Sequence, residues 1–319
     1  MITRWIPVLA MVAAACAFAQ DFPTRTVKIV VPWPPSGNVD ITARTVAPAF
    51  SEALGAQVLV ENLSGAGGRI GTAAVAKATA DGYTLLLGSS GTITSGPAVF
   101  KSISYDPLKD FVAIGPIQSV PIVLTAAPKT PVSNFKEFAA LANAKPGQVS
   151  IASAGSGSSN HLAIELLMRQ ANLKLLHIPY KGSGPAIIDL LGSQVESMMD
   201  QLTASIEHIR SGRLKALAVS SKTRSALLPN VPTLDELGVK GYEASTFTGL
   251  FAPSGIPVPA ADKLYAALRR ALSNETVRER YRSMGVDVMD LSRAEFTAYV
   301  RADFEKWRTI AREGNIVVE

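Results

Sequence analysis

Cysteine and histidine are scarce in this sequence, which holds one cysteine and three histidines among 319 residues. The histidines, at positions 161, 177 and 208, lack the spacing of a metal site. Gly-x-Ser-x-Gly and Gly-Lys-Ser/Thr are both absent, so the sequence carries neither a nucleophile elbow nor a phosphate-binding loop. We therefore expect no bound metal and no cofactor.

A strong charge of either sign is also missing. Lys and Arg total 31 against 26 Asp and Glu, which gives a net charge of +5 without any basic run. Nucleic-acid-binding proteins concentrate basic residues on one face, so a nucleic-acid partner is excluded. With 47% hydrophobic and 18% charged residues, the chain is globular, and its length favours two domains.

The N-terminus has the pattern of a secretory signal peptide over residues 1–19. Arg4 supplies a positive charge, an apolar stretch follows, and Ala17-Phe18-Ala19 forms a small-x-small cleavage site. Cys16 offers a second interpretation, as the lipidated cysteine of a lipoprotein, but its upstream residues fit that signal poorly. We expect an exported, periplasmic protein that is not anchored at Cys16 and whose mature chain lacks cysteine.

Strands and helices alternate along the mature chain, which is typical of a parallel α/β sheet. The first set predicts strands at 27–31, 57–61 and 83–87 and helices at 39–54 and 68–77. Asn38 is placed to cap the first helix, and Pro48 predicts a kink or break within it.

A second set begins after residue 120. It predicts strands at 121–126, 149–153, 175–179, 195–199 and 214–220, with helices at 134–143, 158–171, 185–191 and 204–210 between them. Helices at 259–272 and 292–312 then follow without strands of their own, so we expect them to cover the first lobe's sheet. Asn134 with Glu137, and Ser292 with Glu295, have the spacing of capping boxes.

These sets predict two Rossmann-like lobes joined by a double crossover, which makes a hinge. The expected division places residues 20–121 and 246–319 in lobe 1 and residues 122–245 in lobe 2.

Polar, glycine-rich loops follow several of the predicted strands, at 33–40, 64–71, 89–92 and 154–161. Such loops place backbone N–H groups and hydroxyls at helix N-termini, where an anion binds favourably. The spacing of Gly65, Gly67 and Gly71 departs by one residue from a dinucleotide fingerprint, which disfavours a nucleotide. Ligands of open α/β sheets bind beyond the strand ends, so the sequence favours an anion held between the lobes.

Motifs throughout the mature chain carry a family resemblance. In chain order they are PWPPSG at 32–37, VEN at 60–62, GAGG at 65–68, DGYTL at 81–85, SYDP at 104–107, HIPYKG at 177–182, VPT at 231–233 and GLFAP at 249–253. With them the chain resembles the extracytoplasmic solute receptors of the tripartite tricarboxylate transporter family, also called the Bug family.

The resemblance implies a type II periplasmic-binding-protein fold that closes on a small organic acid and delivers it to membrane permease subunits. It implies no enzymatic activity, and we expect a monomer. The ligand-binding candidates that it places on the two facing loops and the strand ends are Trp33, Ser36, Gly37, Asn38, Ser89, Ser90, Gly91, Ser156, Ser158, Ser159, Asn160, His161, Tyr180, Asp200 and Phe247. We expect loss of the Ser36 or Ser158 hydroxyl to weaken binding about tenfold while leaving stability nearly unchanged.

Some positions depart from the family pattern, which commonly has Phe at Trp33, Gly at Ser36 and Trp at Phe247. These differences leave the bound acid, aliphatic or aromatic, undetermined. Asp200 has two interpretations: it accepts from a ligand hydroxyl or amine, or it caps the following helix at Thr203.

Two other functions stay open from sequence. One is a ligand sensor that docks on a membrane signalling protein, since sensing and transport require the same closure. The other is a secreted serine hydrolase, in which Ser158 or Ser159 would act with His161 and Asp200.

Overall fold

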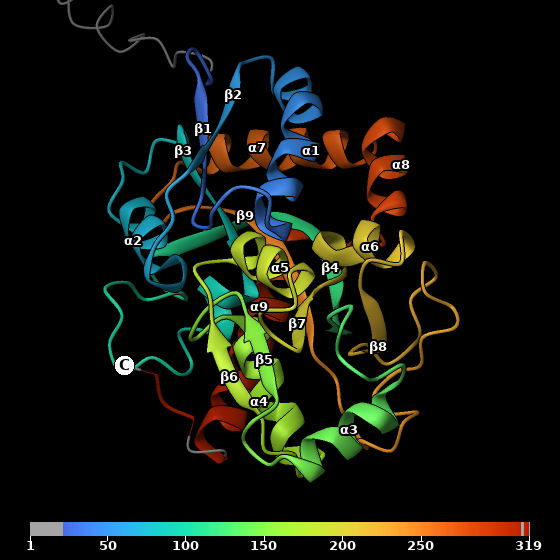
Figure 1. The fold of residues 1–319 in the computed structure, drawn as a ribbon. Coiled ribbons are helices and arrows are strands. Elements are labelled where there is room, and N and C mark those ends of the chain that lie inside the picture. The colour runs from blue at the N-terminus through green and yellow to red at the C-terminus, as the bar shows by residue number, and fades with distance from the viewer. Residues whose placement is uncertain (1–21, 314–315, 319) are drawn as a thin grey trace, which may run out of the picture.

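Strands form the centre of the protein, and helices lie around them (Figure 1). The computed structural model describes residues 22–313 and 316–318, so the predicted signal peptide and Cys16 lie outside the described residues. The fold is mixed α/β, as expected. Its strands are β1 (Val27–Val31), β2 (Val58–Asn62), β3 (Thr84–Ser89), β4 (Phe111–Ala126), β5 (Ser150–Ser153), β6 (Leu176–Pro179), β7 (Ser197–Gln201), β8 (Lys215–Val219), β9 (Ser245–Pro253) and β10 (Asp287–Val288).

The strands pair in two groups. In the first, β1 runs parallel to β2 and β3, while β9 runs antiparallel to β3 and β4. In the second, β5 runs parallel to β6 and β7, while β4 runs antiparallel to β7 and β8. Each group therefore holds a parallel three-stranded core, as two Rossmann-like lobes require.

Strand β4 belongs to both groups because it is much longer than the sequence predicted. We expected a strand from residue 121, whereas β4 begins at Phe111 and pairs with β9 as far as Pro121 opposite Ser245. From Ile122 onward its partners are β7 and β8. The two points where we expected the chain to cross between lobes, near 120 and 245, are thus neighbours in one antiparallel ladder.

Helices cover both groups of strands. They are α1 (Asn38–Leu54), α2 (Arg69–Ala76), α3 (Phe135–Ala144), α4 (Ser159–Gln170), α5 (Ser183–Leu191), α6 (Leu202–Arg210), α7 (Val258–Leu272), α8 (Glu275–Ser283) and α9 (Arg293–Glu313), with short turns at Ala66–Gly68 and Ser90–Thr94. Among the described residues, none of the helices combines the length and the apolar character needed to cross a bilayer.

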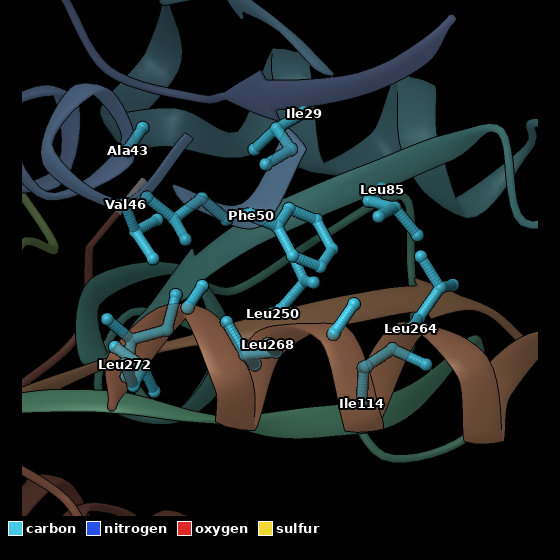
Figure 2. Packing of buried hydrophobic residues seen from close by; sticks show 14 of the residues in the cluster. Ile29, Ala43, Val46, Phe50, Leu85, Ile114, Leu250, Leu264, Leu268 and Leu272 are labelled. Atoms are coloured by element: carbon cyan, nitrogen blue, oxygen red, sulfur yellow. The ribbon is translucent and has the colours of Figure 1, made fainter. Parts of the chain in front are cut away.

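The largest apolar cluster lies where α1 and α7 pack on the first group of strands. Figure 2 shows Phe50 of α1 directly above the strand residue Leu250, with the α7 residues Leu264 and Leu268 to either side below. Phe50 and Leu264 are completely buried. This core fixes α1, and so fixes the loop that leads into it.

The start and the interior of α1 differ from the sequence prediction. Gly37 is the N-cap residue and Asn38 is the first helical residue, so the predicted cap at Asn38 is wrong. The helix continues through Pro48 to Leu54 without a break. The buried residues on either side, Ala47 and Phe50, hold the helix together across the lost backbone hydrogen bond.

Two predicted helix starts are confirmed. Asn134 Oδ1 accepts a hydrogen bond from the Glu137 N–H at 2.9 Å. At α9, Ser292 Oγ accepts from the Glu295 N–H, and Glu295 Oε2 accepts from the Ser292 N–H at 2.8 Å.

Helix α9 packs on both groups of strands. Phe296 and Val300 join the apolar cluster beneath the first group, whereas Trp307 and Ala311 lie in the cluster of the second group with Leu124. We expected this helix to cover the first lobe alone. The apolar stripe is long enough for its second half to reach the other core.

Candidate functional site

Three helix N-termini from the two groups of strands meet around one cavity. The N-terminal ends of α1, α4 and α5 all contribute residues to its wall; the first two follow predicted strand-end loops, whereas the start of α5 was not predicted to line it. About 30 Å³ of free space lies between its walls, which is room for one or two water molecules. The lining residues are Trp33, Pro34, Gly37, Asn38, Val39, Ser89, Ala154, Ser158, Ser159, Asn160, Gly182, Ser183, Gln201, Thr246 and Phe247.

The Trp33 indole forms one wall of the cavity. Its Nε1–H donates to Ser89 Oγ at 3.3 Å, which fixes the ring plane. Gly68 and Gly91 give the ring room, because a Cβ at either position would approach Trp33 Cζ2 to 3.3 Å or 3.1 Å. Gly68 also has a φ of 88°, a conformation that favours glycine. The glycine-rich loop at 64–71 therefore seats Trp33 and does not itself line the inner cavity.

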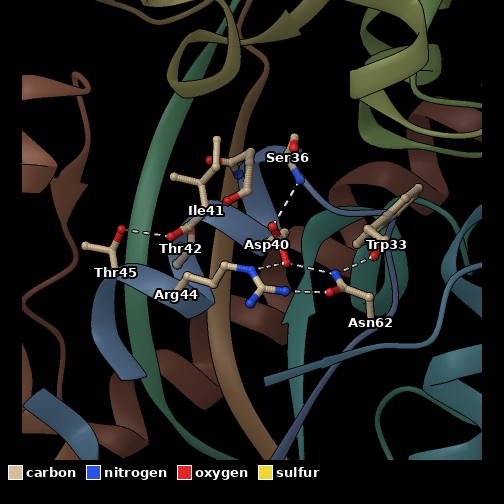
Figure 3. A network of polar contacts seen from close by, with 9 residues as sticks. Trp33, Ser36, Asp40, Ile41, Thr42, Arg44, Thr45 and Asn62 are labelled. Atoms are coloured by element: carbon tan, nitrogen blue, oxygen red, sulfur yellow. Dashed lines mark hydrogen bonds and ion pairs between the residues drawn. The ribbon is translucent and has the colours of Figure 1, made fainter. Parts of the chain in front are cut away.

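An ionic network behind the cavity holds the loop that carries Trp33 (Figure 3). Asp40 Oδ2 accepts from the Ser36 N–H at 3.0 Å, and Asp40 Oδ1 accepts from Arg44 Nε and Asn62 Nδ2. Asn62 Nδ2 also donates to the Trp33 carbonyl at 3.0 Å. Burial alone would raise the pKa of Asp40, but these hydrogen bonds and the Arg44 charge together hold it below its ordinary value. Asp40 therefore stays ionised and braces both ends of the loop.

The first turns of α1 and α4 supply hydrogen-bond donors to the cavity. The first N–H groups of a helix lack intrahelical partners, and the helix dipole makes this end positive. Asn38 adds a side-chain donor: its Oδ1 accepts from Gln118 Nε2 at 2.9 Å, which leaves the Nδ2 hydrogens for the cavity. These ends of the helices suit a carboxylate.

Ser158 is the N-cap of α4. Its Oγ accepts from the His161 N–H at 3.2 Å and donates to the Gly155 carbonyl at 2.7 Å. The hydroxyl hydrogen is thus already used. Loss of this hydroxyl should destabilise α4, contrary to the expectation from sequence.

The opposite wall is backed by a buried carboxylate. Asp200 is fully buried, and its Oδ1 accepts from Ser183 Oγ and Asn160 Nδ2, both at 2.7 Å. Burial raises the pKa of Asp200 to about 6, against the opposing effect of hydrogen bonds from Ser183, the Gln201 N–H and Asn160. These hydrogen bonds go to residues of the cavity wall, rather than to Thr203 as one interpretation of the sequence had it.

The structure separates the predicted ligand-binding residues into two sets. Trp33, Gly37, Asn38, Ser89, Ser158, Ser159, Asn160 and Phe247 come together on the wall of the cavity. Outside that wall lie Ser36, Ser90, Gly91, Ser156, His161, Tyr180 and Asp200.

The residues outside the wall have identifiable surroundings. Ser36 lines a surface groove beside α1 and α8, and Ser90 Oγ accepts from the Phe247 N–H at 2.9 Å. Ser156 and Tyr180 line a neighbouring cavity, where the Tyr180 hydroxyl donates to Asp189 Oδ2 at 2.7 Å. Burial and this Asp189 contact raise the pKa of Tyr180 to about 12.

Other wall residues were not predicted from sequence. They are Pro34, Val39, Ala154, Gly182, Ser183, Gln201 and Thr246. Gly182 and Ser183 could have been found, because they follow a predicted strand and open a predicted helix, as the selected loops do. Ala154 and Thr246 carry no polar pattern in the sequence that marks them as wall residues.

The predicted hydrolase residues are bonded to other partners. His161 Nδ1 accepts from the Gly157 N–H, its Nε2 lies 3.4 Å from Glu165 Oε1, and its ring stacks on His177. Ser158 Oγ meets the backbone N–H of His161 and not the imidazole, and Ser159 Oγ has its contacts with the side chains of Asn160 and Gln201. Asp200 contacts Ser183 and Asn160. The geometry therefore does not support a Ser-His-Asp relay.

A second cavity adjoins the first at its outer end. It has about 460 Å³ of free space and shares Trp33, Pro34 and Ala154 with the inner cavity. Arg69 and Lys181 both line it, and the Arg69 guanidinium lies 3.9 Å above the Phe100 ring. This cavity therefore carries positive charge beside the neutral donors of the inner cavity.

Charged side chains and metal ligands are missing from the inner site. No Asp, Glu, Lys or Arg occurs among the described residues that line the inner cavity. Within residues 22–313 and 316–318, no group of three His, Cys, Asp or Glu side chains is placed to hold a metal ion. Recognition of an anion at this site rests on neutral hydrogen-bond donors and helix dipoles.

Comparisons with known proteins agree with this architecture. Residues 42–316 match the family model described as a tripartite tricarboxylate transporter family receptor. Protein BugT of Bordetella pertussis is 38% identical over 301 residues, covering 94% of this chain and 92% of that protein.

Solved structures are similar over nearly the whole chain. The periplasmic binding protein BugD has a TM-score of 0.90 at 37% identity, covering 93% of this chain and 100% of its own. MatC from Rhodopseudomonas palustris, solved with bound malate, has a TM-score of 0.87 at 34% identity, covering 91% and 99%. An R. palustris protein solved with adipate has a TM-score of 0.90 at 31% identity, covering 93% and 99%.

Proposed function

Because the chain belongs to the family of tripartite tricarboxylate transporter receptors, we propose that it captures a small organic acid between its two lobes for delivery to a transporter of that kind. The observation that carries the proposal is the inner cavity, where the N-termini of α1, α4 and α5 converge without a charged side chain. Malate and adipate, bound by the two R. palustris relatives, are both carboxylates.

The expected affinity follows from the number of donors. A hydrogen bond to a charged oxygen contributes about 1.5 to 3 kcal/mol net. Four or five such bonds would therefore give a dissociation constant of order 1 μM after ordering costs. No arginine clamp is needed for binding of this strength.

Binding without chemistry is the rest of the proposal. The hydroxyl and imidazole that a hydrolase would need are held by backbone groups, as described above. The acid would shift the lobes toward a closed form only to the extent that it binds the closed form more tightly than the open form. The lobes are proposed to comprise residues 20–121 with 246–319 and residues 122–245. The pairing of Pro121 with Ser245 supports these boundaries, while the packing of Trp307 ties the end of α9 to the second lobe.

Family members are periplasmic binding proteins. For this chain we propose export by the signal peptide at 1–19, a monomeric state, and docking on the large and small permease subunits of a tripartite transporter. The signal-peptide pattern in the sequence supports the export step. Membership of the family supports the docking step.

A thermal-shift screen over organic acids, including malate and adipate, tests the proposal. A ligand at 100 times its dissociation constant adds about 2.7 kcal/mol to the free energy of unfolding. Hits are then titrated by calorimetry against wild type, Ala154→Leu and Ser36→Ala. Ala154 lines the cavity, so a leucine there should fill it and abolish binding.

Ser36→Ala is the matched control, since Ser36 lies outside the inner cavity and its loss should leave the affinity unchanged. Failure of every carboxylate to stabilise the wild-type protein would contradict the proposal. If an acid binds Ala154→Leu as tightly as wild type, its binding site lies outside the inner cavity.

A further inference from the structure

The carboxylate of Asp200 lies directly behind the cavity wall and contacts it through two residues. Asp200 has no accessible surface, while Ser183 and Asn160, which donate to its Oδ1, both line the cavity. Its Oδ2 has no hydrogen-bond partner among the described residues. Such a group acts on a ligand only through the side chains that it holds.

The contact with Asp200 decides what Ser183 offers to the cavity. A serine hydroxyl has one hydrogen and two lone pairs. The hydrogen of Ser183 is directed at Asp200 Oδ1 over 2.7 Å, a length typical of a strong charge-assisted bond. What remains for a ligand is the oxygen, which can only accept.

The neighbouring side chains have the same polarity. Both hydrogens of Asn160 Nδ2 are used, one toward Asp200 Oδ1 at 2.7 Å and one toward the Met199 carbonyl at 2.9 Å. Gln201 Nε2 donates to Asn160 Oδ1 at 2.9 Å and lies 3.4 Å from Ser159 Oγ. Gln201 Oε1 lies 3.4 Å from Asn160 Nδ2, and as a carbonyl oxygen it too can only accept from a ligand.

The Asn38 side of the cavity has the reverse polarity. Asn38 is held by Gln118 so that its Nδ2 faces the ligand, and the first turns of α1 and α4 add backbone N–H groups. One part of the cavity thus donates to a carboxylate, and the Ser183 side chain can be satisfied only by a ligand that donates.

We infer that Asp200 is a positioning residue that fixes Ser183 as a hydrogen-bond acceptor and occupies one hydrogen of Asn160, so that the preferred ligand is a carboxylate carrying a hydroxyl or amino group. The inference rests on the proposed function, because it names the substrate class of the same cavity. The burial of Asp200 supports this inference. A buried carboxylate is stabilised by groups that donate to it, so the hydrogens of Ser183 and Asn160 stay directed at Asp200. Although burial raises the pKa of Asp200 to about 6, the carboxyl is mostly ionised at pH 7.5.

The experiment compares acids that differ by one hydroxyl. Malate against succinate, and lactate against propionate, are titrated calorimetrically at pH 7.5 into the full mature protein. We expect wild type to bind the hydroxy acid at least about tenfold more tightly within whichever pair binds, because its deoxy partner leaves Ser183 unsatisfied.

Three variants separate positioning from packing. Ser183→Ala should bring the two affinities within about threefold while the deoxy acid still binds, since the acceptor is gone. Asp200→Ala frees the Ser183 hydrogen and should also reduce the preference. Asp200→Asn keeps an Oδ1 acceptor for Ser183 and should restore the preference for the hydroxy acid. If Asp200 acted through packing alone, the preference would not depend on this acceptor. If Asp200→Ala does not fold, Ser183→Ala still decides the question.

The outcomes distinguish the two proposals. If the wild type binds none of these acids or the acids of the wider screen, the proposed function fails. If it binds a pair with equal affinity, or if Ser183→Ala keeps the full preference, the inference about Asp200 is overturned while the receptor function stands.

Discussion

Serine residues around the site perform different tasks that only their surroundings distinguish. Ser158 caps α4, Ser89 fixes the Trp33 indole, Ser183 faces the cavity with its hydrogen turned away, and Ser36 lies outside. The sequence identified most of these as polar residues after strands. It could not assign the direction of each hydroxyl, because the partners, such as Asp200 for Ser183 and Trp33 for Ser89, come from other elements of the fold.

Ser36 has a φ of 68°, a left-handed conformation that a side chain makes unfavourable by about 1 to 2 kcal/mol. We expect Ser36→Gly to raise the free energy of unfolding by up to about 1 kcal/mol, since glycine's extra chain entropy offsets part of the relief. Urea unfolding measures the change. Ser36→Ala, which keeps the strain, serves as the control and should give no gain; a glycine variant less stable than the alanine variant would refute the argument.

The cap at α4 gives a second prediction. Ser158→Ala should lower the free energy of unfolding by about 1 kcal/mol, because the His161 N–H loses its acceptor. Ser159→Ala is the matched control one residue along, where the Oγ contacts are no shorter than 3.4 Å. Equal stability of the two variants in urea would mean that the cap contributes nothing.

Asp200 predicts a pH-dependent stability. An aspartate titrates near 3.9 in the unfolded chain, whereas burial raises the pKa of Asp200 to about 6 in the fold. The folded state therefore holds its proton more tightly. The contribution of this proton to the free energy of unfolding is fully present below pH 4 and is lost as the pH rises through 6.

Asp200→Asn removes this titration and keeps the acceptor for Ser183. The variant should gain stability over wild type as the pH rises from 4 to 7.5. The difference between their free energies of unfolding should increase by about 2 to 3 kcal/mol over that range. Urea unfolding at both pH values measures the difference. A difference that does not change with pH would show that Asp200 titrates normally.

At the scale of elements, loops and helix starts build the site, and glycines set how closely the loops approach. Gly182 opens α5 with a φ of 117°, and a Cβ there would lie 2.8 Å from Pro34 Cγ on the facing loop. The close approach of these two loops therefore requires glycine at this position.

We expect Gly182→Ala to weaken ligand binding by about ten- to a hundredfold, because the overlap with Pro34 must be relieved by moving the loops apart. Gly212→Ala is the control: its φ of 70° is also strained, but nothing lies within 4 Å of its Cβ. That variant should lose stability and keep its affinity. If both variants lose affinity by the same factor, the cause is backbone strain and not the overlap with Pro34.

Elements with regular local patterns were predictable from the sequence, and those governed by distant contacts were not. The branched run at 27–31 and the capping residues at 134 and 292 specify their structures locally. The extension of β4 back to Phe111 depends on pairing with β9, more than 100 residues later in the chain. The continuity of α1 through Pro48 depends on the buried contacts of Phe50.

At the scale of the molecule, the chain links its two groups of strands through β4, β9 and α9 (Figure 1). Trp307 of α9 is 1% exposed and packs in the second apolar core, while Phe296 of the same helix packs beneath the first strand group. The helix thus couples the two cores.

Trp307→Ala should therefore lower the free energy of unfolding by about 3 to 5 kcal/mol, the usual result of truncating a fully buried aromatic side chain. In calorimetry we expect the wild type to unfold in one transition and Trp307→Ala in two, because the lobes lose a shared helix. Arg301→Ala, at an exposed position of the same helix, is the control and should leave one transition. An unchanged transition in Trp307→Ala would contradict a coupling role for α9.

The central claim is that the inner cavity, and not the outer one, holds the carboxylate. A crystal structure of the protein with an acid identified by the thermal-shift screen tests this most directly. We expect carboxylate oxygens within about 3 Å of backbone N–H groups in the first turns of α1 and α4, beside the Asn38 side chain. An acid bound instead to Arg69 and Lys181 in the outer cavity, with the inner cavity left to water, would contradict the account.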